Sequence, residues 1–60
     1  MSSAEIKREL IDRINFVIIE MKNIEVNAKN GLTIHQMADL ERYANTLDLL
    51  GSAYDHLKDC

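Results

Sequence analysis

Hydrophobic residues recur with a helical spacing through the first half of the chain. They follow one another every three or four positions, which predicts an amphipathic helix over residues 3–29. This first stripe consists of Ile6, Leu10, Ile14, Val17, Met21, Ile24 and Ala28. Successive helical residues turn by about 100°, so Ile11 and Ile18 widen the stripe on one flank. Phe16 lies well off the stripe and Ile19 nearly opposite it, so one neighbouring element cannot cover all the apolar sides.

A second stripe predicts a helix over residues 33–58. Its members are Met37, Leu40, Tyr43, Ala44, Leu47, Leu50, Tyr54 and Leu57. Gly51 interrupts this stripe, and we expect the small residue to let a partner helix approach closely.

Local signals mark where both helices begin and where the first one ends. Ser2-x-x-Glu5 and Thr33-x-x-Gln36 fit capping boxes, and Leu32 with Met37 has the spacing of a hydrophobic staple. Asn30-Gly31 predicts a turn over residues 30–32, because glycine tolerates the left-handed conformation of a helix C-cap. We also expect Glu9 to pair with Arg13, and Glu25 with Lys29.

Two helices of matched length with a short link predict an all-α antiparallel hairpin that forms a single domain over residues 1–60. Two facing stripes make a thin core. A 60-residue chain has only marginal folding stability unless disulfides, a metal or oligomerisation stabilise it. We therefore expect hairpins to dimerise into a four-helix bundle, with at least one of Phe16 and Ile19 between subunits. The predicted oligomer interface consists of Phe16, Ile18, Ile19, Tyr43 and Leu50.

Composition narrows the functional classes. The net charge of −3 disfavours a dedicated surface for nucleic acid or for anionic membranes. The run from Phe16 to Ile19 is far shorter than a membrane span, and the only cysteine, Cys60, fits a reducing setting. No signal peptide is visible, so we expect a cytoplasmic protein.

Two side-chain pairs have the spacing of reactive groups. His56 and Cys60, with Asp59 beside them, are four residues apart and form a candidate pair of metal ligands. His35 and Asp39 have the spacing of a base and its orienting carboxylate. Neither pair has the further ligands, nucleophile or oxyanion motif that a site needs, so we predict no catalytic, metal or cofactor site and no enzyme activity.

Two charged groups are candidates for binding. Lys7, Arg8 and Arg13 are the densest basic group, but acidic residues are interleaved with them. Glu41, Asp48 and Asp55 repeat every seven residues along one flank of the second stripe, and Leu49 projects away from that stripe. We predict these three acids and Leu49 as the partner-binding residues, with a basic partner favoured.

The expected shape resembles the small helical hairpins typified by plasmid copy-number RNA-binding regulators. The chain also resembles the sporulation aspartyl-phosphate phosphatases, which are short helical hairpins as well and whose second helix carries Ser-Gln-Glu-Leu-Asp, although the first helix expected here is longer than in that family. The comparable stretch here is Ala44-Asn45-Thr46-Leu47-Asp48, which matches at Leu47 and Asp48 only. The first resemblance implies a fold, and the second carries no activity over because its defining polar residues are missing.

These observations favour a small non-enzymatic regulator or adaptor that acts by protein–protein interaction. An RNA-binding four-helix-bundle regulator is the alternative, and a bundle that sequesters a small ligand between subunits is a third reading. The sequence alone does not identify the partner.

Overall fold

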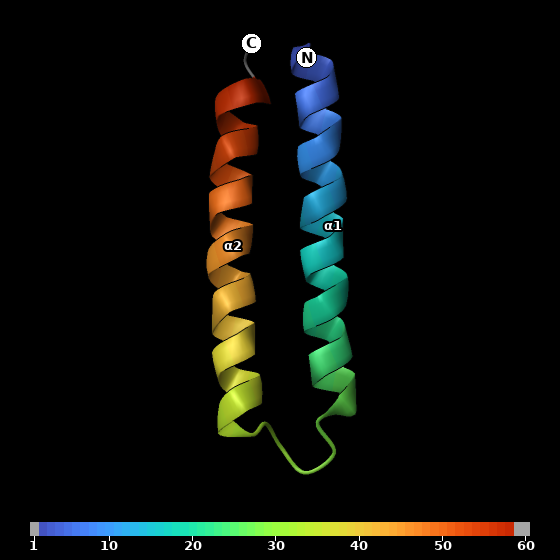
Figure 1. Ribbon diagram of the computed structural model, residues 1–60, viewed down its shortest axis with the longest axis vertical. Coiled ribbons are helices and arrows are strands. Elements are labelled where there is room, and N and C mark those ends of the chain that lie inside the picture. Colours follow the sequence, from blue (N-terminus) through green and yellow to red (C-terminus); the bar gives the residue numbers. More distant parts are fainter. Residues whose placement is uncertain (1, 59–60) are drawn as a thin grey trace.

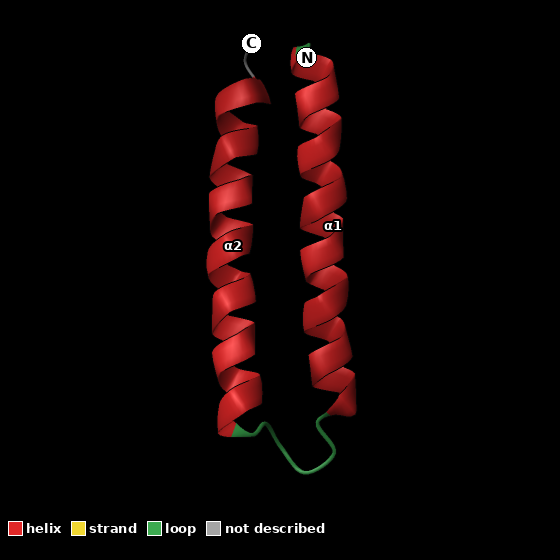
Figure 2. Cartoon of the chain, in the orientation of Figure 1, coloured by secondary structure: helices red, strands yellow, loops and turns green. Residues whose placement is uncertain are grey.

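The computed structural model describes residues 2–58 as two antiparallel α-helices (Figure 1). Helix α1 spans Ser3–Asn27 and helix α2 spans Ile34–Lys58, with 25 residues in each. The helices lie side by side, and the loop over residues 28–33 joins them at one end (Figure 2). The all-α hairpin is thus confirmed, and its dimensions of 45 × 15 × 14 Å are those of a thin rod.

The start of each helix is fixed by a side-chain cap. The Glu5 backbone N–H donates to Ser2 Oγ at 3.2 Å, and the Ser2 hydroxyl donates to Glu5 Oε1 at the same distance. At α2 the capping box is reciprocal between Thr33 and Gln36. The three bonds donated by the Glu5, Thr33 and Gln36 backbone N–H groups satisfy donors that a helix leaves without internal partners. At α1 the Glu5 carboxylate accepts from the Ser2 hydroxyl and not from a backbone N–H, so the predicted capping box is only half formed there.

The connection differs from the predicted turn. Helix α1 ends at Asn27, two residues early, and the Ala28 backbone N–H donates to the Glu25 carbonyl at 3.3 Å. Asn23 and Asn27 are poor helix formers, so the last turns of α1 have low helix propensity. Lys29 therefore lies outside the helix, and the helical i, i+4 pairing predicted with Glu25 does not apply. Gly31 does adopt a positive φ of 91°, as expected for this turn.

The two helices bury very little. Among residues 2–58, only Val17 is buried, with 5% of its surface exposed. The rest of the first stripe is half-buried, as are Leu40, Tyr43, Leu47, Leu50, Tyr54 and Leu57 from the second. The predicted stripes therefore face each other, but one layer of contact leaves each of them partly open to solvent.

Two members of the second stripe were assigned wrongly. Met37 is 58% exposed, and Ala44 is also exposed. At about 100° per residue, both lie roughly 60–80° from Leu47, on the flank of the stripe, beyond the reach of α1. Ile11 is 42% exposed for the same reason, on the corresponding flank of α1.

Candidate interaction surface

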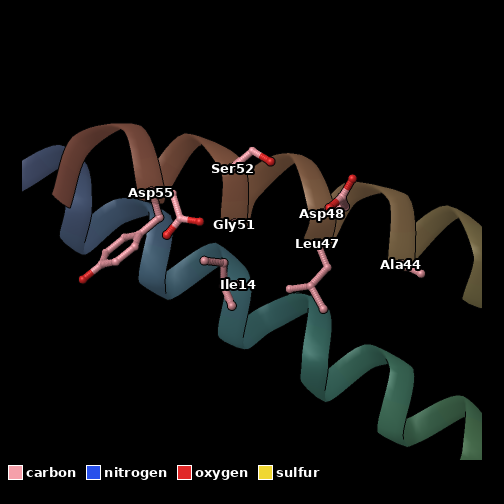
Figure 3. A pocket seen from close by; sticks show the side chains of 8 residues that line it. Ile14, Ala44, Leu47, Asp48, Gly51, Ser52 and Asp55 are labelled. Carbon is pink, nitrogen blue, oxygen red and sulfur yellow. The ribbon is translucent and has the colours of Figure 1, made fainter. Parts of the chain in front are cut away.

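A hollow on one side of the hairpin lies between the middle of α1 and the second half of α2 (Figure 3). Ile14 is its one lining residue from α1, and its side chain and that of Leu47 lie between the two helices. The remaining lining residues come from α2: Ala44, Asp48, Gly51, Ser52, Tyr54 and Asp55. We call this side of the hairpin the hollowed face.

Small residues create the hollow. Ala44 and Gly51 are seven residues apart and therefore lie on the same side of α2. A Cβ atom added at Gly51 would meet no atom within 4 Å, so packing inside the chain leaves room for a side chain at this position. The spacing of Ala44 and Gly51 is the signal in the sequence that points to this hollow.

The predicted acids occupy one rim of the hollowed face. Asp48 and Asp55 line the hollow, and Glu41 lies one heptad before Asp48 on the same side of α2. We call Glu41, Asp48 and Asp55 the acidic edge. All three are exposed, and Asp55 Oδ1 lies 3.7 Å from Lys58 Nζ. An exposed pair of this kind contributes little stability, so the edge remains available for other contacts.

Leu49 belongs to a different surface from the acidic edge. It is 71% exposed, and it lies about 100° around the helix from Asp48, away from the hollow. The four predicted partner-binding residues therefore do not form one patch.

The five residues predicted for the oligomer interface are also spread around the hairpin. Phe16 and Ile19 are 61% and 55% exposed, on the outer side of α1. Ile18, Tyr43 and Leu50 are half-buried. Phe16 and Ile18 point about 160° apart, so one flat contact cannot cover both residues.

The basic group is partly engaged within the chain. Arg13 Nη1 lies 3.3 Å from Glu9 Oε2, as predicted, and also donates to the Glu9 carbonyl at 3.1 Å. Lys7 is half-buried, whereas Arg8 is exposed. These three residues therefore do not present a continuous basic patch.

The two candidate reactive pairs lie at opposite ends of α2, and the structure describes only the pair of His35 and Asp39 in full. Asp39 Oδ1 lies 3.9 Å from Arg42 Nη1, and His35 is exposed in the first turn of α2. Across residues 2–58, no three His, Cys, Asp or Glu side chains are grouped so that they could hold a metal ion. The predicted pairing of His56 with Cys60 and Asp59 cannot be placed, because residues 59 and 60 lie outside the described part of the chain.

The two helices do not have the character of membrane spans. Neither α1 nor α2 combines the length and the apolar composition that crossing a bilayer requires.

Comparisons with protein-family models, with curated proteins and with solved structures give no match for this chain.

Proposed function

We propose that this chain is a small non-enzymatic regulator or adaptor that acts by binding another protein, and that a second copy completes its hydrophobic core. The observation that carries this proposal is the imbalance between buried and exposed apolar side chains. Val17 alone is buried among the described residues, while eight large apolar side chains are exposed. They are Ile11, Phe16, Ile19, Val26, Leu32, Ile34, Met37 and Leu49.

The exposed area supports self-association. The isolated chain exposes 4777 Å². A folded monomer of 6.9 kDa is expected to expose about 4,000 Å². The excess of roughly 800 Å² is similar to the area that one partner buries in a standard protein–protein interface.

Apolar side chains on several sides of the hairpin support a second kind of partner. A dimer of hairpins covers one face of each copy, so part of the apolar surface stays outside it. Apolar side chains left exposed in this way are available to contact another protein. An adaptor needs both features, a core shared between copies and an outer surface for its target.

Affinity capture from a native lysate, with and without nuclease, tests the proposed function. A protein that is captured equally in both conditions supports it. If capture instead depends on nucleic acid and falls steeply with salt, the RNA-binding alternative replaces it.

A further inference from the structure

The hollowed face carries features that specify how a second copy would fit. We propose that another copy of this chain docks face to face on it, with both loops at the same end of the bundle. In this arrangement, α1 of each copy lies against α2 of the other, and the two-fold axis runs parallel to the helices. The inference rests on the proposed self-association and adds the face and the orientation of the dimer.

The first argument is the fit between large and small side chains. Ile11 and Ile18 are seven residues apart on α1, at about 60° and 40° from Ile14, on the side that faces the hollow. Gly51 and Ala44 repeat with the same spacing on α2. The large residues of one copy would therefore fill the gaps of the other, as knobs fill holes between packed helices.

The levels of these residues along the rod match. The helices have equal lengths and run antiparallel, and their ends lie at similar heights along the rod (Figure 1). Counting inward from these ends therefore places Ile11 near the level of Gly51. Ile18 comes equally close to the level of Ala44. A two-fold axis along the rod preserves these levels between copies.

The second argument is charge. Arg8, Asn15 and Lys22 repeat every seven residues along the outer rim of α1 on the hollowed face, and we call them the basic edge. Each lies within two residues, or about 3 Å, of the level of one member of the acidic edge. The charge matches are Arg8 with Asp55 and Lys22 with Glu41, and the neutral Asn15 lies near the level of Asp48. In the proposed dimer, the basic edge of each copy lies beside the acidic edge of the other.

These charges are not already committed within the chain. Over residues 2–58, no ion pair or hydrogen bond engages the side chains of Arg8, Lys22, Glu41 or Asp48. The only acid of the edge with a partner is Asp55, which has the exposed contact with Lys58. Complementary charges of this kind mainly set the choice and orientation of a partner.

The other face-to-face arrangement is disfavoured both by the side-chain fit and by the charges of the two edges. A two-fold axis across the rod would place α1 against α1 and α2 against α2. Isoleucines would then meet isoleucines, and the gaps at Ala44 and Gly51 would face each other and stay empty. Like charges would also meet along both edges, which opposes association.

The proposed dimer leaves a defined outer surface. Phe16 on α1 and Leu49 on α2 point away from the neighbouring helix and from the second copy. Ile19 lies only about 20° around α1 from Arg8 and therefore borders the dimer contact. This geometry assigns Ile18 to the dimer contact and leaves Phe16 and Leu49 for a different protein.

Charge reversal at the two edges tests the orientation. Lys22→Glu places two acids together at both symmetric contacts, and Glu41→Lys places two bases there. Each variant alone is expected to raise the dimer dissociation constant about tenfold, measured by sedimentation equilibrium. In an equimolar mixture, the two variants pair with each other and restore attraction at both contacts, so near wild-type affinity returns.

Arg42→Glu is the matched control because it changes the net charge equally on a rim away from the hollowed face. It should leave the dissociation constant within about twofold of wild type. Circular dichroism on each variant checks that the helices are retained. If Lys22→Glu tightens the dimer, or the mixture shows no recovery, the orientation is wrong although self-association stands. A monomeric wild-type chain overturns both the orientation and the proposed self-association.

Crosslinking of the wild-type chain gives a second readout. Because no residue is changed, a folding defect of a variant cannot affect the result. A carbodiimide joins a carboxylate to a lysine amine with loss of water. In a mixture of ¹⁴N- and ¹⁵N-labelled wild-type chains, peptides that join Lys22 of one isotope to Glu41 of the other are expected. If crosslinks between isotopes join α2 to α2 through Lys58 and the acidic edge, and the Lys22–Glu41 crosslink is missing, the orientation is overturned.

Discussion

Thr33 and Gln36 cap the start of α2 with two reciprocal hydrogen bonds. The Thr33 backbone N–H donates to Gln36 Oε1 at 2.9 Å, and the Gln36 backbone N–H donates to Thr33 Oγ1 at 3.1 Å. The pair is exposed and involves no residue of α1. A cap of this kind sets where the helix begins without help from tertiary packing.

Removing the cap should destabilise the hairpin measurably. Thr33→Ala is expected to lower the free energy of unfolding by about 1 kcal/mol, because the Gln36 backbone N–H loses its acceptor. Thr46→Ala is a suitable control, since that hydroxyl donates to the Arg42 carbonyl in the middle of the helix. Chemical denaturation followed by circular dichroism makes the comparison, and equal stability of Thr33→Ala and wild type would contradict the role of the cap.

The loop requires a positive φ at Gly31, where φ is 91°. Gly31→Val is expected to lower the free energy of unfolding by about 1–2 kcal/mol, because a β-branched residue fits positive φ poorly. Gly31→Asn is the control and should cost less, since asparagine tolerates this region. An added Cβ would meet no atom within 4 Å, so backbone strain alone is tested. Similar thermal melts for both variants would contradict the expectation.

Local signals predicted most of the features that α1 and α2 have individually. The capping residues placed both helix starts, and the three-and-four spacing of apolar residues predicted the two stripes that face each other. The errors in the second stripe concern residues whose burial depends on how much of α2 is covered by α1. Met37 and Ala44 belong to the second stripe by spacing, yet α1 does not reach their flank. Helix α1 ends early at Asn27, where asparagines of low helix propensity weaken the last turns.

The candidate surface was harder to predict than the helices. The partner-binding role of Glu41, Asp48, Asp55 and Leu49 stays a prediction, and Leu49 lies on a different side of α2 from the three acids. The hollow needs Ile14 of α1 beside Gly51 of α2, and that relation depends on how the two helices are rotated against each other. Spacing within a single helix carries no information about this rotation.

Filling the hollow should separate dimer formation from folding. Gly51→Leu is expected to keep or raise helix content, because leucine has the higher helix propensity and an added Cβ meets no atom within 4 Å. It should nevertheless weaken self-association at least about tenfold, since the new side chain occupies the space proposed for Ile11 of the second copy. Circular dichroism and analytical ultracentrifugation provide the two readouts. An unchanged dimer would show that the hollowed face is not the interface.

The outer surface should respond differently. Leu49→Ala is expected to speed dissociation of a captured target protein, because the leucine would supply apolar burial of up to about 2 kcal/mol. The dimer dissociation constant should stay unchanged, since Leu49 points away from the hollowed face. Surface plasmon resonance with the captured target measures the dissociation rate. A slower or equal rate would place the target's contact elsewhere, with Phe16 as the next residue to test.

The mass of the purified wild-type chain in solution tests the proposed self-association most directly. Multi-angle light scattering after size-exclusion chromatography at micromolar concentration should give at least twice the 6.9 kDa chain mass. The thermal midpoint should also rise with protein concentration, because unfolding is then coupled to dissociation. A stable 6.9 kDa monomer that melts cooperatively, with a midpoint independent of concentration, would contradict the claim that a second copy completes the core.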